Sequence, residues 1–279
     1  MSHLSTIRIA FIGAGNMASA MIGGLVNNGL QPSQLKAADP IAESRSKIEK
    51  LTGVATSANN LEVIADANVV ILAVKPQQMK TVCQGISATI SNRQPLVISI
   101  AAGITVEQLE RWLGANKQAP AIVRCMPNTP ALINSGATGM YANSATSTEQ
   151  RSLARQILES TGIVCEVGNE TQLDAVTALS GSGPAYFFFV MEAMKAAGIQ
   201  LGLEEKTAGE LTLQTALGAA RMACESDVSP AELRRRVTSP GGTTEAAIRT
   251  FEENHLREIF ASAMKAADSR SKTLSREME

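Results

Sequence analysis

The sequence lacks any marked excess of charge of one sign. It holds 25 lysine and arginine residues against 26 aspartate and glutamate residues, and its formal net charge is −1 over 279 residues. A chain without a basic excess has no overall attraction to nucleic acid or to an anionic membrane surface. We therefore expect no nucleic acid and no membrane as partner, and a small molecule as the ligand.

Metal-ligating side chains and histidines are also scarce. The two histidines, His3 and His255, stand in no H-E-x-x-H pattern, and we expect neither to act as a catalytic base. The cysteines form no C-x-x-C pair, so the sequence predicts neither a disulfide framework nor a zinc site, and we expect no metal. We expect reduced, mostly buried thiols of a cytosolic protein at Cys83, Cys125, Cys165 and Cys224.

Long uncharged apolar runs are missing as well. The most apolar segment, residues 184–203, carries Glu192 and Lys195 near its middle, where a charge would be costly in lipid. The N-terminal residues show no apolar stretch followed by a small-residue cleavage site, so we expect a cytoplasmic protein. A helix that is apolar on most faces must be covered by protein, which favours a second subunit or neighbouring helices.

What the sequence does contain is a regular alternation of β-branched runs and amphipathic helical stretches. The strand-like runs are residues 7–15, 35–39, 69–76, 96–103, 121–128 and 162–169. This rhythm predicts an α/β fold in which helices cover both faces of a parallel sheet, and the remainder of the chain has helical spacing only. We therefore expect a Rossmann-like, doubly wound domain over residues 1–168 and an all-α domain over residues 169–279.

The first strand runs directly into a glycine-rich loop that opens a helix. Gly13, Gly15 and Ala18 form a G-x-G-x-x-A pattern, which permits a tight turn, leaves bare backbone for a pyrophosphate and lets helix and strand pack closely. Asp39 lies where such a domain places an acidic residue on the adenosine ribose. However, Ser44, Arg45 and Lys47 follow within the next turns and can bind a phosphate, so the sequence leaves NAD against NADP open.

The ends of the other strands are expected to line the same crevice, because ligands of open α/β sheets bind beyond the carboxyl ends of the strands. Small residues at these ends would let a dinucleotide lie against backbone, whereas small turn residues are also ordinary features of strand ends. Asn128 and Thr129 lie between two prolines and can donate hydrogen bonds to a carboxamide. The other candidates at these ends are Ala73, Lys75, Ala101, Ala102 and Gly103.

A second glycine-rich stretch, residues 234–248, opens another helix far along the chain. No side-chain base is apparent, and a reaction that suits such a site is hydride addition to a protonated C=N bond, which already carries its proton. Backbone amides of residues 241–244 would bind a substrate carboxylate at the helix N-terminus, and Thr244 can direct its hydroxyl at the ring nitrogen. The alternative is an ordinary capped helix after a Gly-Gly turn. Arg234, Arg235 and Arg236 are interpreted as a solvated helix face.

Residues 179–189, LSGSGPAYFFF, repeat this design with two glycines, two serines and Pro184 in a first helical turn. Backbone with so few side chains suits packing on a flat nicotinamide ring, and it equally suits close packing of helices.

Together, the stretches FIGAGNM, AVKP, MPNTP, LSGSGPAY and VTSPGGTTEAAI resemble the pyrroline-5-carboxylate reductases over nearly the whole chain. The resemblance implies NAD(P)H-dependent reduction of 1-pyrroline-5-carboxylate to L-proline, the last step of proline biosynthesis, with NADPH expected first and NADH possible. It also implies a homodimer with interlocked C-terminal helices, which in some members assembles into a larger ring. Asp39 falls where several members have a small hydroxyl residue, which leaves the cofactor preference open.

The resemblance and the residue patterns described above together give the expected site residues. The expected catalytic residue is Thr244. The expected substrate-binding residues are Ser239, Gly241, Gly242, Thr243 and Thr244. The expected cofactor-binding residues are Gly13, Gly15, Asn16, Met17, Asp39, Asn60, Ala73, Lys75, Pro76, Ala101, Gly103 and Asn128.

Two other readings stay open at this point. A β-hydroxyacid dehydrogenase would need a lysine base close to the glycine-rich segment, and Lys195 lies roughly 16 Å along a helix from Pro184. A catalytically silent dinucleotide sensor would need the first loop and no second anion site.

Overall fold

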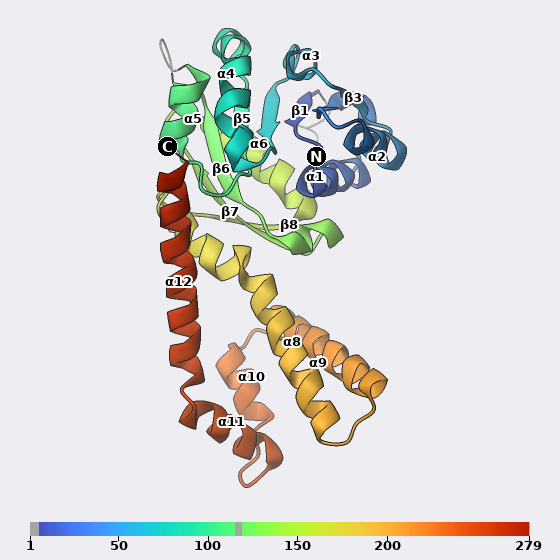
Figure 1. Cartoon of the computed structure of the whole chain (residues 1–279), viewed down its shortest axis with the longest axis vertical. Helices are drawn as coiled ribbons and strands as arrows, with labels where there is room; N and C mark the ends of the chain where they lie inside the picture. Colours follow the sequence, from blue (N-terminus) through green and yellow to red (C-terminus); the bar gives the residue numbers. More distant parts are fainter. Residues whose placement is uncertain (1–5, 115–118, 279) are drawn as a thin grey trace. The chain divides into compact units, whose positions relative to one another are not determined.

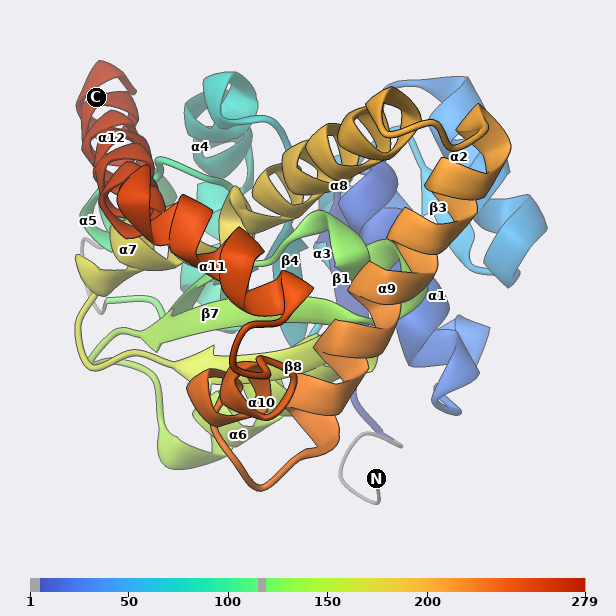
Figure 2. The same cartoon turned by 90° about the horizontal axis from the view of Figure 1, so that it is seen from below.

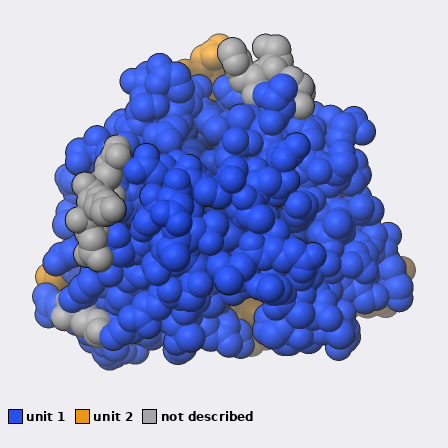
Figure 3. Space-filling model, turned by 90° about the horizontal axis from the view of Figure 1, so that it is seen from above, with its two compact units in different colours: residues 1–182, 267–279 blue, residues 183–266 orange. Residues whose placement is uncertain are grey.

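The computed structural model describes residues 6–114 and 119–278, and the chain divides into two compact units (Figure 3). The first unit consists of residues 1–182 together with 267–279, and the second of residues 183–266. His3 lies outside the described residues.

The first unit is built on one sheet of eight strands in the order β3-β2-β1-β4-β5-β6-β7-β8. All neighbouring strands are parallel except β6 and β7, which are antiparallel. In this register Ile12, the last residue of β1, pairs with the last residues of both β2 and β4. The strands are β1 (Ile9–Ile12), β2 (Leu35–Ala38), β3 (Ala55–Ser57), β4 (Val69–Leu72), β5 (Leu96–Ser99), β6 (Ile122–Met126), β7 (Gly136–Ala142) and β8 (Gly162–Glu166).

Helices cover both faces of this sheet, so the predicted doubly wound α/β architecture is confirmed (Figure 1). Alternate residues of the central strands enter opposite cores: Phe11 belongs to the core that includes residues of α1, α2 and α6, whereas Ile12 belongs to the core that includes residues of α3, α4 and α5. The helices of this unit are α1 (Asn16–Asn27), α2 (Ala42–Thr52), α3 (Asn60–Ile64), α4 (Pro76–Arg93), α5 (Val106–Leu113), α6 (Thr148–Leu158) and α7 (Gln172–Val176). Shorter turns are η1 (Pro32–Gln34), η2 (Thr129–Ile133), η3 (Glu159–Thr161) and the π-helix η4 (Thr177–Gly181).

The second unit is entirely helical, and α8 and α9 pack against each other within it (Figure 1, Figure 2). Its helices are α8 (Gly183–Gln200), α9 (Glu205–Glu225), α10 (Pro230–Arg236) and α11 (Thr243–Glu253), together with the first part of α12 (Leu256–Glu277). In residues 183–266, all of which are described, Ala208 is the only buried apolar residue. Phe187 and Phe189 of α8 are 68% and 71% exposed in the single chain. This unit therefore has almost no core of its own.

The compact units differ in two places from the expected division at residue 168. Helix α7 and the π-helix η4 belong to the first unit, because Leu173 and Ala178 are buried and α7 packs on β6 and β7. The contact is close: a Cβ placed on Gly139 of β7 would lie 2.5 Å from Val176 Cγ1. The end of α12 also belongs to the first unit, where Met278 packs against the core formed with α4 and α5.

Among the described helices, none combines the length and the apolar character that a membrane crossing requires.

Candidate active site

The glycine-rich loop joins β1 to α1 and depends on its first glycine. Gly13 has φ +100°, and a Cβ at this position would lie 2.5 Å from the carbonyl oxygen of Ala73 at the end of β4. The Gly13 amide donates to the carbonyl oxygen of Ala38, 2.7 Å away, at the end of β2. By contrast, a Cβ on Gly15 would meet nothing within 4 Å. Gly13 therefore closes the turn against two strands, and Gly15 leaves exposed backbone open to a ligand.

Helix α1 begins at this open backbone without a cap. Its N-cap, Gly15, offers no side chain, and its first turn carries no acidic residue. The starts of α5 and α6 are capped by the side chains of Thr105 and Ser147, whereas α2 and α4 also begin without a side-chain cap, after Ile41 and Lys75. Uncapped amides at a helix N-terminus carry partial positive charge and are free to bind water or an anion. The loop thus fits the pyrophosphate of a dinucleotide, with Asn16 and Met17 in the first turn.

Asp39 holds the glycine-rich loop at the end of β2. One carboxylate oxygen accepts a hydrogen bond from the Ala14 amide at 2.8 Å, and the other accepts one from the Ile41 amide at 2.8 Å. Arg45 of α2 donates through one terminal nitrogen to the carbonyl oxygens of Asp39 and Pro40, at 2.7 and 3.0 Å. The carboxylate is thereby fixed on the side of the loop where a dinucleotide ribose is expected.

The other predicted cofactor residues of the first unit lie at the same edge of the sheet. The parallel strands are in register, so the segments that follow them meet beyond their carboxyl ends. Lys75 is exposed, and the remaining four residues are at least half-buried. The five residues, Lys75 included, are Ala73 after β4, Lys75 and Pro76 at the start of α4, Ala101 after β5 and Asn60 at the start of α3.

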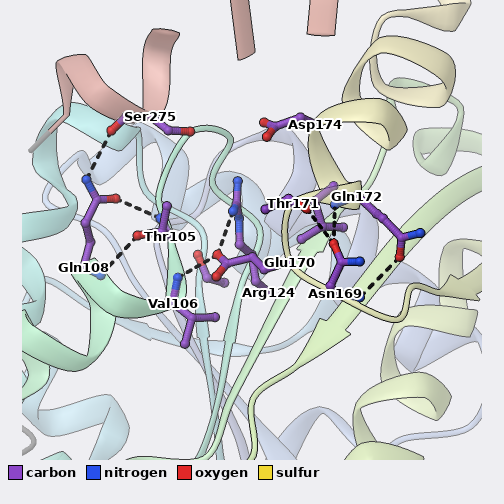
Figure 4. Close-up of polar contacts among 12 residues, drawn as sticks. Thr105, Val106, Gln108, Arg124, Asn169, Glu170, Thr171, Gln172, Asp174 and Ser275 are labelled. Atoms are coloured by element: carbon purple, nitrogen blue, oxygen red, sulfur yellow. Dashed lines mark hydrogen bonds and ion pairs between the residues drawn. The ribbon is translucent and has the colours of Figure 1, made fainter. Parts of the chain in front are cut away.

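Gly103 lies in the loop after β5 and is covered by the end of α12. It has φ +74°, and a Cβ there would lie 3.6 Å from the side chain of Leu274. Figure 4 shows the Gln108 side chain reaching α12, where its Nε2 donates to the carbonyl oxygen of Ser275 at 3.2 Å. Ser271 donates to a carboxylate oxygen of Asp174 in α7 at 2.6 Å. The chain's last helix therefore braces a loop that we predict to contact the cofactor.

An ion pair lies beneath this brace. Arg124 of β6 donates to Glu170 Oε1 at 2.7 Å, and the same oxygen accepts the Val106 amide at 2.8 Å (Figure 4). The side chain of Arg124 is 8% exposed and that of Glu170 is 23% exposed. Sequence reasoning missed this pair; the available signal was one arginine within an otherwise apolar strand.

Asn128 has a structural role that the sequence did not indicate. Its Nδ2 donates to the carbonyl oxygen of Ser180 in the π-helix at 3.0 Å, and its Oδ1 accepts the Ala137 amide at 2.9 Å. The side chain thus ties the end of β6 to η4 and β7. The cofactor contact assigned to Asn128 stays a prediction. The stretch LSGSGPAY forms the end of this π-helix, and α8 begins at Gly183.

The second glycine-rich loop lies in the second unit, between α10 and α11. Gly241 has φ +71°, and its amide donates to Glu245 Oε2 at 2.7 Å, while the Gly242 amide donates to the carbonyl oxygen of Ser239 at 3.0 Å. The α11 N-cap, Gly242, makes no side-chain cap. Two of the four amides predicted for the substrate are thus engaged within the loop, and those of Thr243 and Thr244 stand at an uncapped helix start. Glu245 was missed by sequence reasoning.

The basic run before this loop is an exposed helix face, as predicted. Arg235 and Arg236 pair with Glu232 at 2.7 and 2.9 Å, and hydrogen bonds from these guanidinium groups lower the pKa of Glu232 to about 2. Arg234 pairs with Glu252 of α11. These three side chains therefore have acidic partners within their own unit.

Two family models match the chain. The model described as pyrroline-5-carboxylate reductase dimerisation matches residues 170–274, and the model described as NADP oxidoreductase coenzyme F420-dependent matches residues 8–103. The pyrroline-5-carboxylate reductase of Pseudomonas aeruginosa is 54% identical over 275 residues, which are 99% of both chains.

Solved structures give the same picture. A pyrroline-5-carboxylate reductase from Coxiella burnetii is 45% identical, with a TM-score of 0.93 over 97% of this chain and 99% of the other. The Plasmodium falciparum pyrroline carboxylate reductase with NADP bound is 30% identical, with a TM-score of 0.84 over 97% of this chain and 99% of the other. The similarity therefore extends over both units and is not confined to a nucleotide-binding fold.

Proposed function

Because this chain belongs to the pyrroline-5-carboxylate reductase family, an oxidoreductase family, we propose that it reduces 1-pyrroline-5-carboxylate to L-proline. NAD(P)H, when bound, supplies the hydride that adds to the C=N bond. The observation that carries the proposal is the pair of helix starts with a glycine N-cap, Gly15 and Gly242, within a chain that matches the family over its whole length.

The first unit would hold the cofactor through backbone. The amides of Gly15, Asn16 and Met17 would bind the pyrophosphate, and Asp39 would bind the adenosine ribose. The strand-end residues described above would contact the remainder of the dinucleotide. The structure of a relative with NADP bound supports a dinucleotide as the ligand.

The second unit would hold the substrate. The amides of Thr243 and Thr244 at the start of α11 would bind its carboxylate, aided by the positive end of the helix. Glu245 now accepts the Gly241 amide, so that amide becomes available to the substrate only when the glutamate side chain moves away. Ser239 and Gly242 would complete the loop, and the Thr244 hydroxyl would bond the ring nitrogen and orient the imine for hydride transfer.

The experiment compares two threonine substitutions on the same helix. Thr244→Ala should lower kcat at least tenfold with little change in the Kd for NAD(P)H, because the lost hydroxyl would contact substrate only. Thr250→Ala is the matched control, since Thr250 donates its hydroxyl to the Ala246 carbonyl of α11 and lies outside the loop. Following nicotinamide absorbance with 1-pyrroline-5-carboxylate measures turnover. Equal activity in Thr244→Ala and Thr250→Ala would show that Thr244 has no catalytic role.

We also propose that the second unit dimerises with a second copy of the chain through interlocked helices. An 84-residue unit with one buried apolar residue cannot be stable by itself, and its exposed phenylalanines and leucines need cover. The match to a dimerisation model over residues 170–274 supports the same partner. A larger ring of dimers and a cytoplasmic location stay predictions.

A further inference from the structure

The structure assigns the choice of cofactor to Asp39, and we propose that this chain prefers NADH to NADPH. The two cofactors differ only in the phosphate on the adenosine 2′-oxygen, so the preference depends on the groups that meet this position. The inference rests on the proposed function for the location of the ribose, and it goes beyond it by naming the cofactor. It also reverses the order expected from the family resemblance, which placed NADPH first.

The Asp39 carboxylate is held so that it cannot turn away from the expected ribose position. Both of its oxygens are held at 2.8 Å by backbone amides, one from Ala14 in the glycine-rich loop and one from Ile41 before α2. Rotation of the side chain would break both hydrogen bonds and leave two amides without acceptors. The backbone of Asp39 is fixed as well, because its amide donates to the Ser57 carbonyl of β3 at 3.1 Å.

Each carboxylate oxygen keeps a lone pair after accepting one amide, so Asp39 can accept hydrogen bonds from the ribose hydroxyls of NADH. A 2′-phosphate has lost the hydroxyl proton and carries up to two negative charges. Repulsion between such charges at hydrogen-bonding distance corresponds to a factor of about ten or more in affinity.

A cation near Asp39 would be needed to offset this repulsion. Arg45 is the half-buried candidate on α2, and both hydrogens of its Nη1 are used on the carbonyl oxygens of Asp39 and Pro40. Its Nη1 thus holds the backbone of the turn, and Nε and Nη2 are the nitrogens left for a phosphate. Lys47 is exposed, and a phosphate contact from such a side chain would be screened by water.

The test measures the Kd of the purified protein for NADH and for NADPH without substrate, by quenching of Trp112 or by calorimetry. The wild-type chain should bind NADH at least tenfold more tightly than NADPH. Asp39→Ser should shift the ratio of the two Kd values at least tenfold toward NADPH, and Asp39→Asn should shift it in the same direction while it keeps one acceptor for a loop amide. Damage to the loop would weaken both cofactors equally, so the ratio isolates the charge effect.

Arg45→Ala is the control that tests whether Arg45 binds the 2′-phosphate. If Arg45 only holds the turn, this variant should leave the ratio within about threefold of wild type. The proposal is overturned if wild type binds NADPH more tightly, if the ratio in Asp39→Ser matches wild type, or if Arg45→Ala loses NADPH binding selectively by more than tenfold. Because these are binding measurements, a chain that prefers NADH and fails to reduce 1-pyrroline-5-carboxylate would refute the proposed function alone.

Discussion

The buried ion pair of Arg124 and Glu170 gives a sharp stability prediction. Glu170→Ala would leave the Arg124 guanidinium, which is 8% exposed, without its acid and the Val106 amide without its acceptor. Removing one partner of a fully buried ion pair costs about 3–5 kcal/mol, and the 23% exposure of Glu170 argues for a smaller loss. We expect the free energy of unfolding of the first unit to fall by about 2–4 kcal/mol.

A double substitution separates the contribution of the charge to stability from that of the hydrogen bond. Glu170→Gln keeps an oxygen for the Val106 amide and removes the negative charge, so Arg124 stays unpaired. Adding Arg124→Met to it removes the buried positive charge as well, and this pair of substitutions should recover at least half of the stability lost in Glu170→Ala. Glu159→Ala, which removes a 3.7 Å surface contact to Arg155, is the control and should cost less than about 1 kcal/mol.

The assay is urea unfolding followed by the fluorescence of Trp112. This residue is the only tryptophan of the chain, is 5% exposed and lies on the buried face of α5, so it reports on the first unit. For a unit of this size the expected loss corresponds to a fall in Tm of roughly 4–16 °C. The reasoning is refuted if Glu170→Ala costs no more than Glu159→Ala, or if the double variant is as unstable as Glu170→Gln.

Two further predictions concern thiols and assembly. Burial raises the pKa of both Cys83 and Cys125 to about 12, so about one part in 10⁴ of each is thiolate at pH 8; neither should react with a thiol reagent until urea unfolds the protein. Rapid labelling of either cysteine in the folded protein would contradict its placement. In light scattering, the chain should have at least twice its own mass, and a monomeric mass at micromolar concentration would exclude the proposed dimer.

Much of the first unit could be predicted from local sequence because its signals are local. The β1 run, Gly13 and Gly15 lie within a few residues of one another, and the geometry that they require is that of one turn. Strand β7 was missed because its sequence, GATGMYA, has two glycines and little strand propensity. Gly139 is required there by contact with Val176, 37 positions away, and no local pattern reports such a contact.

The same limit explains which parts of the candidate site could be predicted from the sequence. The helix starts at Gly15 and Gly242 could be predicted, because glycine before a helix is visible in the sequence, and the anion sites at these starts stay predictions. The partners of Asn128 include Ser180, 52 positions away, so the side chain looked like a free hydrogen-bond donor. Glu170 meets Arg124 across 46 positions. Pairings of this kind follow from the fold and cannot be derived before it.

The return of α12 to the first unit has a consequence for biosynthesis. Residues 267–278 are made after the whole of the second unit, yet Leu274 and Ser275 lie against the loop at Gly103. At about 5–20 residues per second, a ribosome needs roughly 4–17 s to add the intervening segment. During that interval the nascent sheet lacks these contacts, and the loop after β5 is without its cover from α12.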